Sequence, residues 1–287
     1  MSEDVGRVNW FPGHMAKAKR KIQENLKFVD AVVEIADARI PESSRNPDLD
    51  SIINGKPRIL ILNKCDMADP KLTQKWMEHY LSLGIATICL DSKSGKGLSK
   101  FIPCMKKVLN DKILNYKKKG FVNKKLKFMV VGIPNVGKSS FINKLIKEKR
   151  AKTADKPGVT RGNQWFSVGQ NFELLDTPGV LWPKIDDPIV GQKLAFYGSI
   201  KDDILDIENL ACDLIDALKK DYSNLLKSRY DLESDTFFLK SYEILNQIAL
   251  KRGFFMSKGE LDIRRTANMI LDEFRAAKLG RITLDLI

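Results

Sequence analysis

A glycine-rich stretch, Gly132 to Ser139, has the residue types and the spacing, G-x-x-x-x-G-K-S, that bind the phosphates of a nucleotide. It follows a short apolar run, Lys127 to Val131, and precedes a segment with helical spacing, Ser140 to Ile146. In this context of strand, loop and helix, backbone N–H groups face the phosphates, the lysine spans the β and γ groups, and the serine hydroxyl binds magnesium. A glycine-rich turn that only caps a helix is the simpler alternative. The predicted phosphate ligands are Val136, Gly137, Lys138, Ser139 and Ser140, and Ser139 is the predicted magnesium ligand.

The four residues Asn63 to Asp66, NKCD, could recognise a guanine base. They follow Arg58 to Leu62, whose apolar side chains predict a buried parallel strand. The Asp66 carboxylate can accept hydrogen bonds from N1–H and the 2-amino group of guanine, whereas adenine offers an acceptor at N1 and no 2-amino donor. Because a buried carboxylate without donors is costly, the motif predicts GTP rather than ATP as the ligand.

A second predicted strand supports this interpretation, since the string N-K-x-D alone could be an ordinary turn. The segment Ala86 to Gly95, ATICLDSKSG, places Ser92 and Lys93 directly after a strand, where they can contact the guanine O6. Within NKCD, Asn63 is expected to tie the base to the phosphate loop, and the Lys64 stem is expected to pack over the ring.

The segment Phe172 to Gly179 and the stretch upstream of it carry the remaining candidate ligands. FELLDTPG predicts an apolar strand that ends in Asp176, whose carboxylate can hold magnesium through water, and the Gly179 N–H can sense the γ-phosphate. The stretch Pro157 to Gly162, PGVTRG, has one hydroxyl, Thr160, which we predict to be the switch threonine that reaches the metal.

These motifs occur in an unusual order, because the base-binding motif precedes the phosphate loop in the sequence. A doubly wound α/β domain tolerates such a circular permutation, since its natural ends lie close together at the surface. The joint would be the lysine-rich segment Asn110 to Lys125, predicted to be helical to about Lys119 and then exposed. We therefore predict an α/β, circularly permuted P-loop GTPase domain with a mostly parallel sheet over residues 1–183, and a small all-helical domain over residues 184–287. Because the DTPG segment ends the first domain, the nucleotide state is expected to set the posture of the second.

Three further segments combine with NKCD, GIPNVGKSS and PGVT into a specific pattern. They are NWFPGHMAKAKR (Asn9 to Arg20), DARIPESSRNP (Asp37 to Pro47) and DTPGVLWP (Asp176 to Pro183). With this set the chain resembles the circularly permuted ribosome-biogenesis GTPases, and most closely those of the ribosome biogenesis GTPase A, or YlqF, type. The resemblance covers nearly the whole chain.

The resemblance implies a factor that acts late in maturation of the large ribosomal subunit, binds ribosomal RNA and hydrolyses GTP when docked there. It also implies that His14 swings towards the γ-phosphate, the alternative being a surface histidine that anchors the N-terminal helix. Asn135 matches a position at which related GTPases coordinate potassium, the alternative being a loop residue without that role. Ras-like enzymes place a water-orienting glutamine where this chain has Val180, followed by Leu181, so we expect slow intrinsic hydrolysis that a partner stimulates.

The charge of the chain indicates a polyanionic partner. The formal net charge is +13 and the pI is near 9.4. Residues 1–180 hold 33 Lys and Arg against 18 Asp and Glu, whereas residues 181–287 hold 16 against 18. The basic surface is therefore expected on the GTPase domain and its lysine-rich joint.

The four cysteines show no paired C-x-x-C spacing, which argues against a structural zinc site and fits a reducing compartment. The N-terminus has no apolar signal region, and no apolar segment is long enough to cross a membrane. We expect a cytoplasmic monomer with neither a membrane nor DNA as a partner.

The C-terminal region has apolar residues at helical spacing and predicts a small helical bundle. The predicted helices are Glu208 to Lys220, Ser241 to Gly253 and Glu260 to Gly280, with Gly253 and Gly280 as helix stops and Ile200 to Leu205 as a shorter piece. Four aromatic residues, Phe237, Phe238, Phe254 and Phe255, are predicted to be core rather than base-stacking platforms. The ending RITLDLI could be a short docking strand or a frayed tail.

Three functions remain open at this level. The favoured one is a GTPase assembly factor whose GTP form grips ribosomal RNA and whose hydrolysis releases it. The second is an RNA-binding or checkpoint module in which GTP is only a ligand, which Val180 supports. The third is a GTPase with a non-ribosomal partner, such as transfer RNA modification or a signalling protein.

Overall fold

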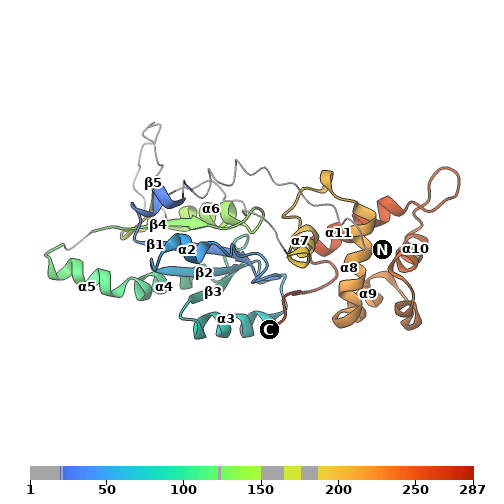
Figure 1. The fold of residues 1–287 in the computed structure, drawn as a ribbon, viewed down its shortest axis with the longest axis horizontal. Coiled ribbons are helices and arrows are strands. Elements are labelled where there is room, and N and C mark those ends of the chain that lie inside the picture. The colour runs from blue at the N-terminus through green and yellow to red at the C-terminus, as the bar shows by residue number, and fades with distance from the viewer. Residues whose placement is uncertain (1–19, 21, 122–123, 150–164, 176–186) are drawn as a thin grey trace. The chain divides into compact units, whose positions relative to one another are not determined.

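The computed structural model describes residues 20, 22–121, 124–149, 165–175 and 187–287. Within these residues, six strands form one sheet in the order β3-β2-β1-β4-β6-β5 (Figure 1). Neighbouring strands are parallel except β5 and β6, which are antiparallel, so the predicted mostly parallel α/β sheet is confirmed. The strands are β1 (Ala31–Asp37), β2 (Arg58–Asn63), β3 (Ala86–Leu90), β4 (Leu126–Val131), β5 (Trp165–Val168) and β6 (Phe172–Leu175).

The pairing of β1 with β4 joins the two permuted parts of the sequence. Val33 of β1 lies opposite Val130 of β4 in a parallel register. From β1 the chain builds outward through β2 to β3, and from β4 it builds outward in the other direction. Ligands of such sheets bind outside the carboxyl ends of the strands where the strand order reverses. NKCD and the phosphate loop follow the carboxyl ends of β2 and β4, so both lie at this edge.

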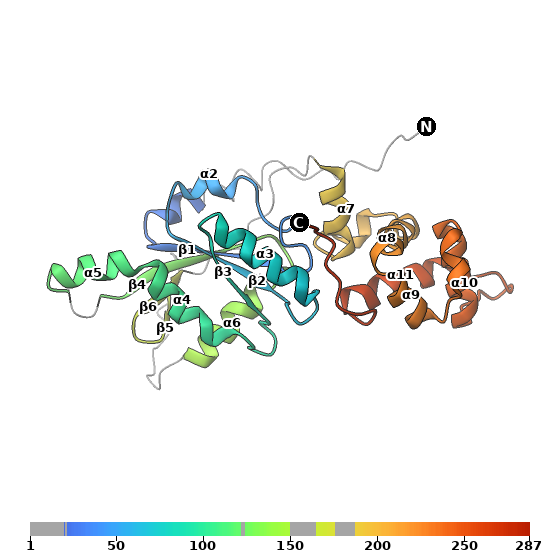
Figure 2. The ribbon, with the colours of Figure 1, turned by 90° about the horizontal axis from the view of Figure 1, so that it is seen from below.

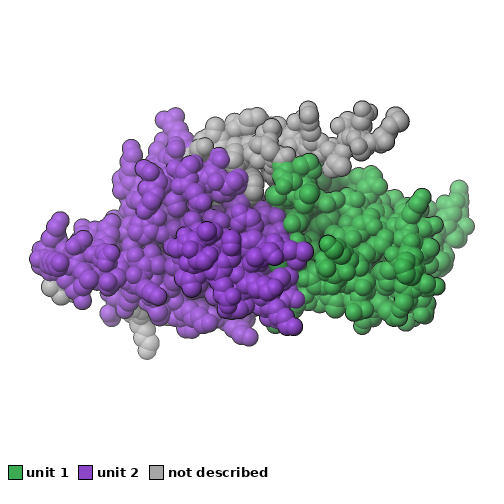
Figure 3. Space-filling model, turned by 60° about the horizontal axis from the view of Figure 1, so that its bottom comes forward, with its two compact units in different colours: residues 1–8, 185–284 green, residues 9–184, 285–287 purple. Residues whose placement is uncertain are grey.

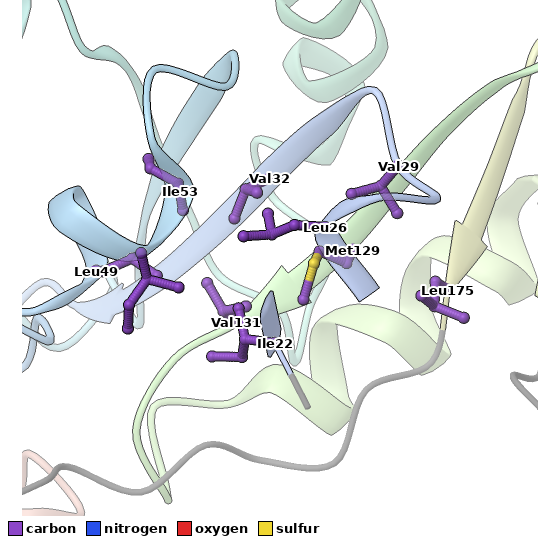
Figure 4. Packing of buried hydrophobic residues seen from close by; sticks show 10 residues of the cluster. Ile22, Leu26, Val29, Val32, Leu49, Ile53, Met129, Val131 and Leu175 are labelled. Atoms are coloured by element: carbon purple, nitrogen blue, oxygen red, sulfur yellow. The ribbon is translucent and has the colours of Figure 1, made fainter. Parts of the chain in front are cut away.

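One face of the sheet packs against α2 (Leu49–Ile53), α3 (Pro70–Ser82) and the helical residues 22–26. Figure 4 shows one cluster of this face, in which Val32 and Met129 from the sheet meet Leu49 and Ile53 of α2. Further along the same face, α3 packs two aromatic rings, Trp76 and Tyr80, against Leu60 and Leu62 of β2. Every residue of β1 is buried, as expected for a central parallel strand.

The opposite face packs against α4 (Phe101–Val108) and α6 (Lys138–Lys149), so the sheet lies between two helical layers (Figure 2). Phe101 of α4 lies 5.6 Å from Phe128 of β4 and 5.3 Å from Phe141 of α6, measured between ring centroids. These tilted and edge-to-face contacts hold α6, and with it the end of the glycine-rich loop, against β4.

The lysine-rich joint forms α5 (Asn110–Lys118), which confirms the predicted helix, and its C-cap is Lys119. None of its residues is buried. Beyond the helix, the Lys124 ammonium lies over the Tyr116 ring at 4.3 Å and over the Phe121 ring at 5.2 Å. The joint therefore displays lysines and aromatic rings at the surface.

Residues 185–284 group into a second compact unit, drawn in green in Figure 3, and residues 9–184 with 285–287 form the unit that contains the sheet. The described part of the second unit is helical, as predicted. Its helices are α7 (Pro188–Phe196), α8 (Ile207–Asp221), α9 (Ser223–Tyr230), α10 (Ser241–Arg252) and α11 (Ile263–Arg275), with short 3-10 turns η2 (Asp202–Ile204) and η3 (Ser234–Phe238). A 3-10 turn, η1 (Leu98–Lys100), also precedes α4 in the sheet unit.

The two predicted helix stops have different outcomes. Gly253 is the C-cap of α10 in the left-handed conformation, φ +64°, as predicted. Gly280 is not a stop, because α11 ends at Arg275 and its C-cap is Ala276. A Cβ at Gly280 would lie 3.0 Å from a Leu225 methyl group, so close packing against α9, together with its positive φ, explains the glycine there.

The predicted burial of the C-terminal aromatics is wrong in part. Phe238 is 91% exposed and Phe255 is 49% exposed, so neither is a core residue. Phe254 is half-buried, with the Arg265 guanidinium 4.1 Å above its ring. Sequence spacing did not separate them because all four residues lie at or beyond the ends of helices, where the helical period no longer sets a face.

The ending RITLDLI is neither a docking strand nor a frayed tail. It has no regular secondary structure, yet Ile282, Thr283 and Asp285 are buried. The Tyr222 hydroxyl accepts a hydrogen bond from the Thr283 N–H at 3.2 Å and donates one to the Thr283 carbonyl at 3.0 Å.

In the part of the chain that the structure describes, no helix is long and apolar enough to span a bilayer.

Candidate guanine nucleotide site

The loop between β4 and α6 needs glycine at two positions for two different reasons. At Gly132, φ is +154° and an added Cβ would lie 2.5 Å from the Ile35 carbonyl oxygen of the adjacent strand. At Gly137, φ is +97° and a Cβ would lie 2.2 Å from the Asn63 amide nitrogen. Both distances are too short for a Cβ, so the loop can pack against Ile35 and Asn63 in this conformation only with glycine at the two positions.

Asn63 connects the two motifs. Its side chain is buried, its Nδ2 donates to the Val136 carbonyl at 2.6 Å, and its Oδ1 accepts from the Ser92 N–H at 3.0 Å and the Ser92 hydroxyl at 2.8 Å. One amide thus joins the ends of β2 and β3 to the phosphate loop. The structure therefore brings together, through direct hydrogen bonds, segments that are separated in the sequence by the whole of the joint.

Lys64 makes a second bridge between the motifs. Its backbone is in the left-handed region, φ +60°, and its ammonium donates to the Asn135 carbonyl at 2.6 Å and pairs with the Asp37 carboxylate at 2.9 Å. Asn135, itself at φ +62°, is exposed. The Lys64 side chain is thus stretched from the base-binding motif across to the phosphate loop.

Asp37, at the carboxyl end of β1, is the buried anion that holds Lys64. Arg39 binds it through two nitrogens, Nε to Oδ1 at 2.9 Å and Nη2 to Oδ2 at 2.8 Å, and both side chains are almost fully buried. Burial alone would raise the pKa of Asp37, but the positive charges of Arg39 and Lys64 hold it well below its ordinary value. The carboxylate is therefore charged throughout the neutral range.

Lys138 begins α6 and is half-buried, with its ammonium donating to the Ile133 carbonyl of the same loop. Burial lowers the pKa of Lys138 to about 8. The ammonium is still mostly protonated at neutral pH, and an anion bound beside it would restore its pKa. Ser139 and Ser140 follow in the first turn of α6 and are exposed, so their hydroxyls are accessible to a ligand or a metal.

Asp66 and Lys93 are exposed in the turns that follow β2 and β3, at the same edge of the sheet. The Asp91 carboxylate accepts from the Lys93 N–H at 2.8 Å and so shapes the turn that carries Ser92. Burial alone would raise the pKa of Asp91, whereas hydrogen bonds from Ser94 and the backbone lower it. Four predicted site residues, His14, Thr160, Asp176 and Gly179, lie outside the described residues, as do Val180 and Leu181.

Asp37 and Arg39 are site residues that reasoning from motif chemistry did not single out. The signal was present, because Asp37 ends an apolar strand at the same sheet edge as Asn63, where charged side chains are rare without a partner. In the sequence, the segment DARIPESSRNP stood out only as a mark of family resemblance. Its first and third residues form the buried ion pair beside NKCD.

Comparison with known proteins supplies the deciding observation. The model of the family described as "50S ribosome-binding GTPase" matches residues 127–240. "Ribosome biogenesis GTPase A" of Priestia megaterium is 46% identical over 279 residues, 97% of this chain and 96% of that protein. The protein of the same name from Thermotoga maritima is 30% identical over 97% of this chain and 94% of that protein.

The chain belongs to the ribosome biogenesis GTPase A family. Solved structures agree with this assignment: GNP-bound YlqF from T. maritima has a TM-score of 0.63 and 32% identity, and covers 94% of this chain and 97% of that one. The GDP-bound structure of the same protein has a TM-score of 0.64 and 30% identity, and covers 93% and 98%. The present chain is therefore a circularly permuted GTPase that binds guanine nucleotides, as its sequence predicts.

Proposed function

We propose that this GTPase acts in the cytoplasm as an assembly factor in late maturation of the large ribosomal subunit. In this proposal the GTP form binds ribosomal RNA on the precursor particle, and hydrolysis releases the protein. The names of its relatives support a role in ribosome assembly, and its net charge of +13 supports a polyanionic partner. The protein acts as a monomer, and neither a membrane nor DNA is among its partners.

We assign the guanine end of the site to NKCD and the turn after β3. Asp66 would accept from N1–H and the 2-amino group of guanine, the Lys64 stem would cover the ring, and Ser92 with Lys93 would contact O6. The observation that carries this assignment is the Asn63 amide, which binds Val136 of the phosphate loop and Ser92 at the same time. That contact places the predicted base-binding turns directly beside the phosphate loop, so that one nucleotide could contact both.

We assign the phosphate end to the loop and the first turn of α6. The backbone N–H groups of Val136, Gly137 and Lys138, with the Lys138 ammonium, would bind the phosphates. Ser140 would contact the nucleotide beside them. The exposed Ser139 hydroxyl fits a hard cation such as magnesium, with Thr160 and Asp176 as its partners beyond the described residues and Gly179 as the γ-phosphate sensor. Bound magnesium would neutralise charge on the β- and γ-phosphates.

The residues expected to act in hydrolysis, His14 and those near Val180, lie outside the described residues. Val180 cannot orient water, so we assign slow intrinsic turnover that the ribosomal partner stimulates, with His14 as the candidate polar group. Replacement His14→Ala is expected to lower partner-stimulated turnover and to leave GTP affinity nearly unchanged. Unchanged stimulated turnover in this variant would remove His14 from the mechanism.

Potassium at Asn135 is tested separately. Asn135 is exposed at the phosphate loop, which is compatible with a monovalent cation beside the phosphates. GTP turnover is expected to be faster in potassium than in sodium at equal ionic strength. Equal rates in the two salts would exclude this role.

The main experiment measures GTP hydrolysis with and without purified large-subunit particles, both precursor and mature. If the protein is an assembly factor, large-subunit particles are expected to stimulate its GTP hydrolysis strongly. At least one of the two, precursor or mature, is expected to give faster hydrolysis than buffer or small-subunit particles. A protein that uses GTP only as a ligand would show no stimulation. Co-sedimentation with a non-hydrolysable GTP analogue completes the test, because absence from large-subunit precursors would point to a non-ribosomal partner.

A further inference from the structure

The last residues of the chain form part of the unit that contains the nucleotide site. Asp285 is 3% exposed, and its carboxylate accepts hydrogen bonds from the Glu42 N–H at 2.9 Å, the Ser43 N–H at 2.7 Å and the Ser43 hydroxyl at 2.7 Å. Its main-chain carbonyl accepts from the Trp76 indole N–H at 3.0 Å. Leu286 and Ile287, which follow, are 57% and 61% exposed, so Asp285 is the buried residue among the last three.

The segment that Asp285 binds, residues 40–45, packs beneath the carboxyl end of β1. The Ser44 hydroxyl accepts from the Asp37 N–H at 2.8 Å and donates to the Ile40 carbonyl at 2.6 Å. Arg45 pairs with the buried Glu34 of β1 at 3.1 Å. The segment is therefore anchored to β1. One of its hydrogen bonds goes to Asp37, the residue whose carboxylate also binds Lys64.

A path of hydrogen bonds, connected through the main chain at Ser43–Ser44 and through the Asp37 residue itself, thus runs from Asp285 to the phosphate loop. It passes from Asp285 to Ser43, from the neighbouring Ser44 to Asp37, from Asp37 to Lys64, and from Lys64 to the Asn135 carbonyl. Each link lies within the unit that contains the sheet. Hydrogen bonds to a carboxylate are among the stronger ones in proteins, so the first link is well suited to order a loop.

We infer that Asp285 is a positioning residue for the guanine end of the nucleotide site. Its carboxylate orders residues 42–44, which orient Asp37, and Asp37 in turn holds Lys64 and the turn that carries Asp66. Without it, the N–H groups of Glu42 and Ser43 are left without their acceptor, and the segment gains alternative conformations that compete with the binding-competent one. The inference rests on the assignment of NKCD as the guanine-binding motif made under the proposed function.

The test compares the affinities for GDP and for inosine diphosphate, which differ only by the 2-amino group of the base. The full-length Asp285→Asn variant keeps the shape of the side chain but removes its negative charge, and its amide N–H₂ replaces one of the two oxygens, either the acceptor of both backbone N–H groups or the acceptor of the Ser43 hydroxyl. It is expected to bind GDP about tenfold more weakly and to show a much smaller preference for GDP over inosine diphosphate. Titration with both nucleotides, beside a urea unfolding curve, measures affinity, preference and stability together.

A matched control separates positioning from a general decrease in stability. Glu273 is a similarly buried carboxylate in the helical unit, where it binds Arg229 and Tyr230. Glu273→Gln is expected to lower stability while leaving the ratio of the two affinities unchanged. If Asp285→Asn leaves this ratio at the wild-type value, whether or not stability falls, the inference is overturned.

A milder variant covers the case in which Asp285→Asn does not fold. Ser43→Ala removes only the hydroxyl contact to the Asp285 carboxylate and keeps both backbone N–H contacts. It is expected to shift the ratio in the same direction by a smaller factor, and a ratio equal to wild type would refute the inference. A wild-type protein without any preference for GDP would instead refute the assignment of NKCD, so the two failures are distinguishable.

Discussion

At the level of single residues, the candidate site depends on Asn63, an uncharged side chain that connects the base-binding motif with the phosphate loop. Its amide satisfies a carbonyl of the phosphate loop and two donors of Ser92, and it fills the space that the missing Cβ of Gly137 leaves free. Amides suit this position because they both donate and accept. The pairing of Asn63 with Gly137 is therefore the smallest unit that makes the two motifs one site.

Replacement Gly137→Ala tests this unit. The new Cβ would lie 2.2 Å from the Asn63 amide nitrogen, and alanine at φ +97° is strained by about 1–3 kcal/mol. We expect GTP affinity to fall by about 10- to 100-fold in equilibrium titration, with the Asn63 hydrogen bonds broken. Gly169→Ala is the matched control, because Gly169 has φ +61° in open space and its replacement is expected to leave affinity unchanged. Equal decreases in the two variants would contradict the role given to Gly137.

Replacement Asp37→Asn tests the buried ion pair beside the site. It leaves Arg39 buried without its carboxylate, so we expect the free energy of unfolding at pH 7 to decrease by about 3–5 kcal/mol. Because the pKa of Asp37 is lowered in the folded state, its contribution is present above the ordinary value of 3.8 and disappears as the pH falls below it.

Urea unfolding of wild type and Asp37→Asn, at pH 7 and at acid pH, measures this contribution. The difference between the two proteins is expected to shrink on acidification. The exposed Asp235→Asn serves as the control and is expected to match wild type at both pH values. A difference between wild type and Asp37→Asn that does not change with pH would rule out the charged carboxylate as its cause.

The sequence predicts site residues that belong to a recognisable motif. It misses residues whose role depends on partners that only the fold brings close. NKCD and the glycine-rich loop predict their ligands because their donors, acceptors and glycines occur at a fixed spacing. Asp285 carries no such signal, because its partners Glu42 and Ser43 lie at the other end of the chain. Only the three-dimensional arrangement brings Asp285 within hydrogen-bond distance of these residues.

At the level of elements, strands and helices with long periodic patterns were predicted well, and their ends less well. β2, β4 and α5 lie close to the predicted ranges because apolar runs and helical spacing extend over their whole length. The end of α11 was misplaced, since Gly280 suits tight packing as well as a helix stop. A glycine alone does not distinguish between these two requirements.

Helix α5 is the element with the clearest prediction. Lys117 and Lys118 are exposed on it and have no ion pair among the described residues. If the basic joint binds RNA phosphates, Lys117→Glu with Lys118→Glu should weaken binding to large-subunit precursor particles. The logarithmic salt dependence of that binding should become shallower by about one for each lysine–phosphate pair that the double variant removes.

The matched control for α5 is the same charge reversal at Lys71 and Lys75 of α3, which are also exposed. Both double variants change the net charge of the chain equally. Binding to the particles is therefore expected to separate a local contact from the overall charge. Equal weakening by the two double variants would show that α5 has no special role.

At the level of the whole molecule, the circular permutation leaves a single sheet, whose two halves are connected through the exposed, lysine-rich joint. The first strands of the two parts, β1 before the joint and β4 after it, pair with one another, so cutting and rejoining the chain leaves the switch point intact. The excess positive charge belongs to residues 1–180, most of which group with the sheet unit, rather than to residues 181–287. The candidate nucleotide site and most of the excess positive charge therefore belong to one unit.

The most direct test of the account is titration calorimetry of the wild-type protein with GTP and with ATP, in the presence of magnesium. A single site built from NKCD and the phosphate loop predicts GTP binding at one site per chain and ATP binding weaker by about 100-fold or more, because adenine lacks both donors that Asp66 accepts. Comparable affinities for the two nucleotides would contradict the account, because the base-binding motif would then not contact the nucleotide that the phosphate loop binds.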